Sequence, residues 1–134
     1  MKHIEISERT LHFKQPAGTS RGVYTTRKSY YLTITDDNRS SIKGVGECAT
    51  LPDLSCDAVP EYFKILNDVC RMVEQTGNIP YDILRPYPSI LFGLETAFAQ
   101  LDANGSTCLY DTPFGRGEEG ITINGLVWMG TFEE

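Results

Sequence analysis

Hydrophobic and polar residues alternate along the first third of the chain with a period of two, which predicts β-strands. The clearest strand covers residues 23–35, where Tyr, Leu and Ile side chains at even positions share one face. A strand over residues 3–13 precedes it, and a turn at residues 36–39 leads into a third strand over residues 41–49. Because the connections are short, we expect these strands to form an antiparallel meander.

Two irregularities are expected in and after the first strand. The apolar positions change parity between Ile6 and Leu11, which predicts a bulge near residues 7–10. Residues 14–22 contain two glycines, a proline and small hydroxyl side chains, which predicts a mobile loop longer than a tight hairpin needs. Such a loop is either a plain surface connection or a place where function resides.

The period changes to that of helices after residue 55. Apolar residues recur at helical spacing over residues 59–73 and again over residues 88–103, which predicts two helices with core-facing stripes. Ser55 or Asp57 is suited to cap the first helix, and Gly77 to end it. The expected fold class is therefore α+β, with a three-stranded antiparallel meander followed by a helical bundle.

The last apolar segment, residues 121–130, follows a polar loop over residues 110–120 and is apolar on both of its faces. This pattern is typical of strands in parallel sheets that are covered on both sides. A parallel neighbour needs a crossover of a dozen or more residues, and only residues 131–134 remain. We therefore expect the first strand of a larger α/β domain that is cut here, with a fourth strand at the edge of the meander as the alternative. Its exposed apolar edge would pair with a second copy in a homodimer or fold back onto the helices.

Charge and composition exclude several classes of protein. The formal net charge of −6 argues against nucleic acid and against an anionic membrane surface as partners. No apolar run approaches the roughly 18 residues of a membrane span, and the charged start of the chain is unlike a signal peptide. The four cysteines show no metal-ligand spacing, which favours reduced thiols in a cytoplasmic protein. No spacing of nucleophiles, acids or bases by itself indicates a catalytic centre.

The order of these segments resembles a known family. Three strands with a Gly/Ser-rich connection, the sequence GVGECATLP at residues 44–52, helices and a lone apolar strand resemble the N-terminal capping domain of the enolase superfamily, in its muconate-lactonizing-enzyme subgroup. Within that subgroup, residues 44–55 and the sequence NGLVWMG at residues 124–130 are most similar to the o-succinylbenzoate synthase family. The residues that match the subgroup's first-loop pattern are Phe13, Thr19, Ser20, Gly22 and Arg27.

This resemblance implies two domains and an enzymatic function. Residues 1–120 would form the capping domain, and residues 121–134 the first strand of a truncated (β/α) barrel. The complete enzyme would be a Mg²⁺-dependent dehydratase (a hydro-lyase) of menaquinone biosynthesis that acts on a small-molecule carboxylate substrate. Three barrel carboxylates would hold the metal, and a lysine would be the base. Because those groups would lie outside this chain, we expect the fragment alone to bind no metal and to be inactive.

The resemblance also places substrate contacts on two capping loops, at residues 15–27 and 50–55. The candidate substrate-binding residues in these loops and on the barrel strand are Ser20, Arg27, Leu51, Leu54 and Asn124. Arg27 is suited to a carboxylate and the leucines to an apolar wall. Two alternatives stay open: the capping domain of a dipeptide epimerase or N-acylamino-acid racemase, and a free-standing binding domain without enzymatic activity.

Overall fold

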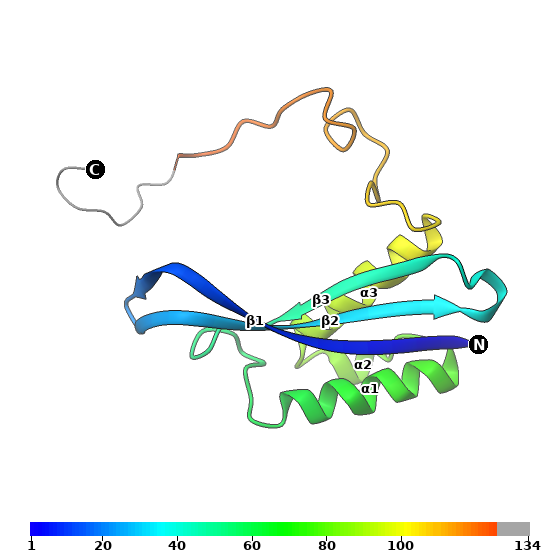
Figure 1. Cartoon of the computed structure of the whole chain (residues 1–134), viewed down its shortest axis with the longest axis horizontal. Coiled ribbons are helices and arrows are strands. Elements are labelled where there is room, and N and C mark those ends of the chain that lie inside the picture. The colour runs from blue at the N-terminus through cyan, green and yellow to red at the C-terminus, as the bar shows by residue number, and fades with distance from the viewer. Residues whose placement is uncertain (126–134) are drawn as a thin grey trace.

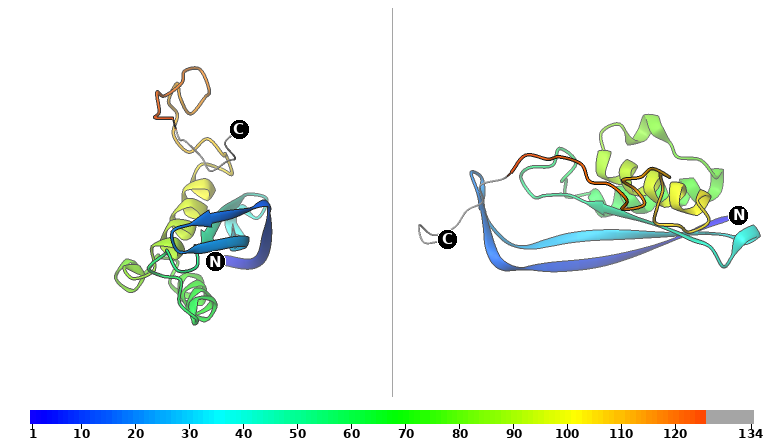
Figure 2. Two further views of the ribbon diagram at one scale, coloured as in Figure 1. Left: turned by 90° about the vertical axis from the view of Figure 1, so that its left-hand side faces the viewer. Right: turned by 90° about the horizontal axis from the view of Figure 1, so that it is seen from above.

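The computed structural model describes residues 1–125 and shows a three-stranded antiparallel sheet followed by helices (Figure 1). The sheet has the order β1–β2–β3, and its strands are β1 (Lys2–Thr19), β2 (Gly22–Asp36) and β3 (Lys43–Ala49). A 3₁₀ turn, η1 (Asp37–Arg39), lies between β2 and β3, and the helices are α1 (Tyr62–Thr76), α2 (Tyr81–Leu84) and α3 (Pro88–Asp102). The helices cover one face of the sheet and leave the other open (Figures 1 and 2). The predicted fold class is therefore confirmed.

The pairing of β1 with β2 is more regular than the sequence pattern predicts. The two strands pair in register from Lys2↔Asp36 to His12↔Thr26, so the bulge predicted at residues 7–10 is wrong. The register shifts instead between His12 and Ala17. The change of parity at Leu11 does not require a bulge. This part of the hairpin has no core beneath it, and the Leu11 side chain is 39% exposed.

The mobile loop predicted at residues 14–22 is also wrong. β1 continues to Thr19, β2 begins at Gly22, and only two residues connect them. Pro16 falls in the irregular stretch between paired segments, where it needs no ladder partner. Since β3 pairs only with residues 29–35 of β2, residues 9–28 extend past it as a two-stranded ribbon, which we call the hairpin arm (Figure 1).

The core lies between the sheet and the helices and uses the faces that the sequence pattern indicates. β2 contributes Leu32 and Ile34, which are both fully buried. The helices contribute buried residues at helical spacing, namely Leu66, Val69, Cys70 and Val73 of α1 and Ile90, Leu94, Ala97 and Leu101 of α3. Burying one large apolar side chain is worth roughly 1.5–3 kcal/mol. This layer therefore supplies most of the stabilisation, and the hairpin arm adds no buried hydrophobic residue to it.

Glycines allow α3 to approach β3 closely. A Cβ atom on Gly46 would overlap the carbonyl oxygen of Gly93, and one on Gly44 would overlap the carbonyl oxygen of Ala97. The Gly-Val-Gly sequence at residues 44–46 is thus explained by backbone packed against backbone.

The helix ends agree only in part with the prediction. Gly77, with φ +74°, ends α1 and donates its N–H to the main-chain oxygen of Val73 at 2.7 Å. The cap predicted at Ser55 or Asp57 is wrong, because α1 begins at Tyr62 and neither residue adjoins it. The sequence pattern gives no indication of α2, because four residues are too few to show a period.

Residues 103–125 follow α3 as an irregular segment with local turns. Residues 121–125 of the predicted final strand show no strand pairing. The remainder of that strand, and with it the expected pairing in a homodimer, lies outside the described residues. Among residues 1–125, no helix has both the length and the apolar character needed to cross a membrane.

Candidate functional site

The tip of the hairpin arm contacts the loop that follows β3, residues 50–55, which we call the second loop. Arg21 Nη1 donates a hydrogen bond to the main-chain oxygen of Asp53 at 2.5 Å. The hydroxyl of Tyr24 donates to the main-chain oxygen of Pro52 at 3.2 Å and lies 3.4 Å from Asp53 Oδ2. Figure 1 shows the second loop beneath the arm. These contacts join the two capping segments that the resemblance indicated into one surface.

The second loop is itself a compact turn. The main-chain oxygen of Leu51 accepts hydrogen bonds from the N–H groups of Leu54 at 3.2 Å and Ser55 at 2.9 Å. The N–H of Leu51 donates to Ser55 Oγ at 2.9 Å, and Asp53 adopts the left-handed conformation with φ +62°. Leu51 and Leu54 remain 40% and 43% exposed. The loop therefore presents two apolar side chains that the core does not bury.

A buried carboxylate fixes the end of the second loop to α3. Asp57 is 2% exposed and accepts hydrogen bonds from the N–H of Ser89 at 2.8 Å and from Ser89 Oγ at 2.6 Å. The hydroxyl of Tyr62 lies 2.6 Å from Ser89 Oγ, and burial raises the pKa of this tyrosine, so it stays protonated. Asp57 thus satisfies an N–H in the first turn of α3, the role that we expected it to play for α1.

The candidate residues lie in four places along the chain. Ser20 is exposed in the two-residue connection at the tip of the arm. Arg27 lies on β2 and is partly buried, and its Nε is buried without a hydrogen-bond partner in the part of the chain that the structure describes. Leu51 and Leu54 lie in the second loop, next to the contacts with the arm. Asn124 is exposed in the irregular segment after α3, on a different element from the other four.

Sequence reasoning missed Arg21 and Tyr24, the two side chains that join the arm to the second loop. If residues 14–22 form a mobile loop, the sequence does not show which of their side chains contact the second loop. A two-residue connection, by contrast, fixes the directions in which the neighbouring side chains point. The available signal was Gly22 directly after Ser20 and Arg21, since a glycine at this place is typical of a tight turn.

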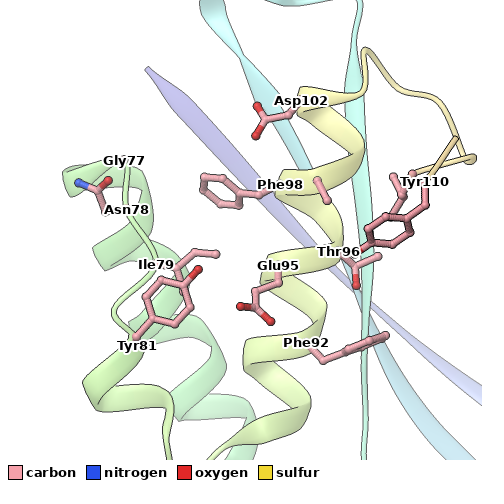
Figure 3. Close-up of a pocket in the computed structure, with 12 residues that line it drawn as sticks. Gly77, Asn78, Ile79, Tyr81, Phe92, Glu95, Thr96, Phe98, Asp102 and Tyr110 are labelled. Atoms are coloured by element: carbon pink, nitrogen blue, oxygen red, sulfur yellow. The ribbon is translucent and has the colours of Figure 1, made fainter.

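A hollow lies on the face of α3 that points away from β3. It has a volume of about 970 Å³ and lies between the connection from α1 to α2, the outer face of α3 and residues 109–110 (Figure 3). Exposed aromatic side chains line it, namely Tyr81, Phe92 and Tyr110. None of the five candidate residues lines this hollow.

Two features of the described residues bear on metal binding and on thiol chemistry. In residues 1–125, no three His, Cys, Asp or Glu side chains are grouped closely enough to hold a metal ion. Burial raises the pKa of the Cys48 and Cys70 thiols, which keeps both protonated and unreactive at neutral pH.

Comparison with known proteins identifies one curated relative. No family model matches the chain. The chain is 28% identical over 163 residues to the o-succinylbenzoate synthase of Desulfotalea psychrophila, and the match covers 97% of this chain and 44% of that protein. This chain thus spans less than half the length of the relative.

Two solved structures are also similar to the chain. MenC from Desulfotalea psychrophila matches with a TM-score of 0.58 and 22% identity, over 96% of this chain and 42% of that one. The o-succinylbenzoate synthase of Thermosynechococcus elongatus, complexed with Mg in the active site, matches with a TM-score of 0.48 and 24% identity, over 79% of this chain and 30% of that one. The resemblance to o-succinylbenzoate synthase that residues 44–55 and 124–130 indicated is therefore confirmed, because this chain is similar to such an enzyme over almost its whole length.

Proposed function

We propose that this chain is the N-terminal capping domain of an o-succinylbenzoate synthase and forms the lid over its active site. The complete enzyme would carry out a dehydration in menaquinone biosynthesis that yields o-succinylbenzoate from a cyclohexadiene carboxylate. The similarity to a synthase over 97% of the chain carries the proposal. The contact between the hairpin arm and the second loop adds a physical reason, because it unites two exposed segments into one covering surface.

In this proposal the lid excludes water and contacts the substrate. Closure of an active site strengthens the electrostatic interactions inside it and prevents side reactions. Leu51 and Leu54, exposed in the second loop, form an apolar wall against the substrate ring. Ser20 and Asn124 offer hydrogen bonds, and Arg27 pairs with the succinyl carboxylate through two nitrogens.

The catalytic groups lie elsewhere in this proposal. The resemblance implies that the ligands of Mg²⁺ and the base would belong to barrel strands, of which residues 121–134 would form the first. The part of this chain in the reaction is to bind, to orient and to exclude water.

An activity assay with Mg²⁺ and the cyclohexadiene substrate tests the proposal. We expect dehydration by a longer protein that contains this chain and a barrel, and none by the 134-residue chain alone. In the longer protein, Arg27→Gln should raise KM about tenfold with a smaller effect on kcat, because it removes a paired carboxylate contact. Lys28→Gln removes the same charge at the next position and serves as the matched control. Turnover by the short chain, or an unchanged KM in Arg27→Gln, would contradict the proposal.

The two alternatives give different results. A dipeptide epimerase or N-acylamino-acid racemase would share this fold, and a substrate screen that finds epimerisation but no dehydration would replace the proposal. A reading frame without a barrel would favour a binding domain without enzymatic activity.

A further inference from the structure

The charges of the chain are unevenly distributed. The hairpin arm, residues 9–28, contains five of the 12 Lys and Arg residues and none of the 18 Asp and Glu residues. The rest of the chain is left with seven basic and 18 acidic residues. A thin basic ribbon therefore projects from an acidic body, and such a ribbon attracts anions.

Among residues 1–125, one of the five basic side chains of the arm forms an ion pair with a carboxylate. Lys28 pairs with Glu8 at 3.0 Å. Arg21 donates to a main-chain oxygen, and the guanidinium of Arg9 lies over the ring of Tyr31 at 5.9 Å from its centre. Neither of the last two contacts cancels a charge, so the arm keeps a net positive field.

The strand register places two of these arginines beside a buried serine. Arg9 is directly opposite Ser29, and Leu11 is directly opposite Arg27. Directly paired residues point to the same face of a sheet, so these four share one face. This face is opposite the helices, because the neighbouring Tyr30 stacks on aromatic rings of α1.

Two polar groups on this face have no hydrogen-bond partner among residues 1–125. Ser29 is completely buried, and neither its Oγ nor the Nε of Arg27 makes a hydrogen bond within that part of the chain. Both groups can donate, so a single acceptor between them satisfies both. A hollow of about 260 Å³ lies on the same side of the sheet and is lined by Ser7, Glu8, Arg9, Tyr31 and Val45.

We propose that Arg9, Arg27 and Ser29 form a site for a carboxylate group of a small organic anion. A carboxylate oxygen accepts hydrogen bonds from Ser29 Oγ and Arg27 Nε, and the guanidinium of Arg9 supplies a second positive charge. Arg27 is only partly buried, so its side chain moves aside to admit the anion, whose organic part enters the hollow beside Tyr31. This inference rests on the proposed function for the source of the anion, a carboxylate substrate, but the site consists of residues of this chain alone.

An NMR titration of the ¹⁵N-labelled 134-residue chain with phthalate tests the site at low, constant ionic strength. We expect saturable shifts of the amides of residues 9, 27 and 29 and of the Nε–H of Arg27. Arg27→Gln should weaken the affinity about tenfold, and Ser29→Ala about threefold. Lys28→Gln removes the same charge one residue away on the opposite face, and its affinity should stay within about twofold of the wild type.

Several outcomes would overturn the site. If phthalate produces no saturable shift, then no carboxylate binds beside Ser29 and Arg27, and a water molecule or nothing occupies that place. An equal loss of affinity in Lys28→Gln and Arg27→Gln shows a diffuse field in place of a site, and equal shifts from neutral phthalamide show that charge plays no part. Methyl signals of Leu32 and Leu94 report whether each variant is folded, and Arg27→Lys, which keeps the charge but not the planar fork, should bind about as weakly as Arg27→Gln.

The site and the proposed function can fail independently. A longer protein without dehydratase activity, together with phthalate bound at this face, would remove the function and leave the site. Dehydratase activity without phthalate binding would remove the site and leave the function.

Discussion

Gly46 lies where the backbone of β3 meets the backbone of α3, and a Cβ atom there would overlap the carbonyl oxygen of Gly93. Gly46→Ala must therefore push the helix away from the sheet. We expect the free energy of unfolding to fall by about 1–3 kcal/mol, the usual cost of overpacking. Urea denaturation followed by circular dichroism measures this change.

Gly120→Ala is the matched control, because a Cβ atom at Gly120 meets nothing within 4 Å. Its free energy of unfolding should change by less than about 0.5 kcal/mol. Equal changes in the free energy of unfolding for both variants would show that the close approach of α3 to β3 does not require glycine at position 46.

The four cysteines differ in their surroundings, and this difference can be measured. Burial raises the pKa of Cys70 to about 12 and also raises that of Cys48, whereas Cys56 and Cys108 are exposed. Only a thiolate attacks a disulfide reagent, and at pH 8 the two buried thiols stay protonated. We expect a thiol-reactive dye to label two cysteines quickly in the folded chain and all four in urea. Fast labelling of all four in the folded chain would contradict the burial of Cys48 and Cys70.

At the scale of elements, one side chain joins the second loop to a helix. Asp57 is buried and holds two hydrogen bonds from Ser89 at the start of α3. Asp57→Ala leaves the N–H of Ser89 without an acceptor and its hydroxyl with Tyr62 as its one remaining side-chain partner, so we expect the free energy of unfolding to fall by about 1–3 kcal/mol. Asp68→Ala, at an exposed carboxylate paired with Lys64, is the control and should cost less than about 0.5 kcal/mol. Similar losses in thermal unfolding of both variants would show that Asp57 has no special role.

The contact between the arm and the second loop predicts coupled motion of these elements. Tyr24→Phe removes the hydroxyl that donates to Pro52. We expect amide hydrogen exchange at Leu54 and Ser55 to become about fivefold faster, an effect of roughly 1 kcal/mol, while exchange in α3 stays unchanged. Thr26→Val, on the same face of the arm but without a bond to the loop, is the control. Unchanged exchange in Tyr24→Phe would show that the arm does not hold the loop.

At the scale of the whole molecule, the sequence predicts those parts of the fold that bury apolar side chains. The periods that indicate β2, α1 and α3 are those of their buried faces, including Leu32, Leu66 and Leu94. The hairpin arm buries no hydrophobic residue, and its outer part, residues 14–22, shows no such period and resembles a loop. The contact of Arg21 with Asp53 joins residues 32 positions apart, and no local pattern records it. The two segments therefore stand out by the resemblance alone, whereas the contacts that join them required the structure.

Because the hairpin arm buries no hydrophobic residue, we expect that it can be removed without loss of the fold. Arg9 and Ser29 are directly paired, so a two-residue Asn-Gly turn in place of residues 10–28 closes the hairpin without a change of register. We expect the free energy of unfolding to change by less than about 1 kcal/mol, because no buried apolar side chain is lost. If the proposed function holds, the same replacement in a longer protein that contains the barrel should lower kcat/KM for dehydration at least about a hundredfold, because the proposed lid would no longer cover and orient the substrate. A shortened chain that fails to fold would show that the arm belongs to the core after all, and a shortened enzyme with undiminished activity would show that the arm is no lid.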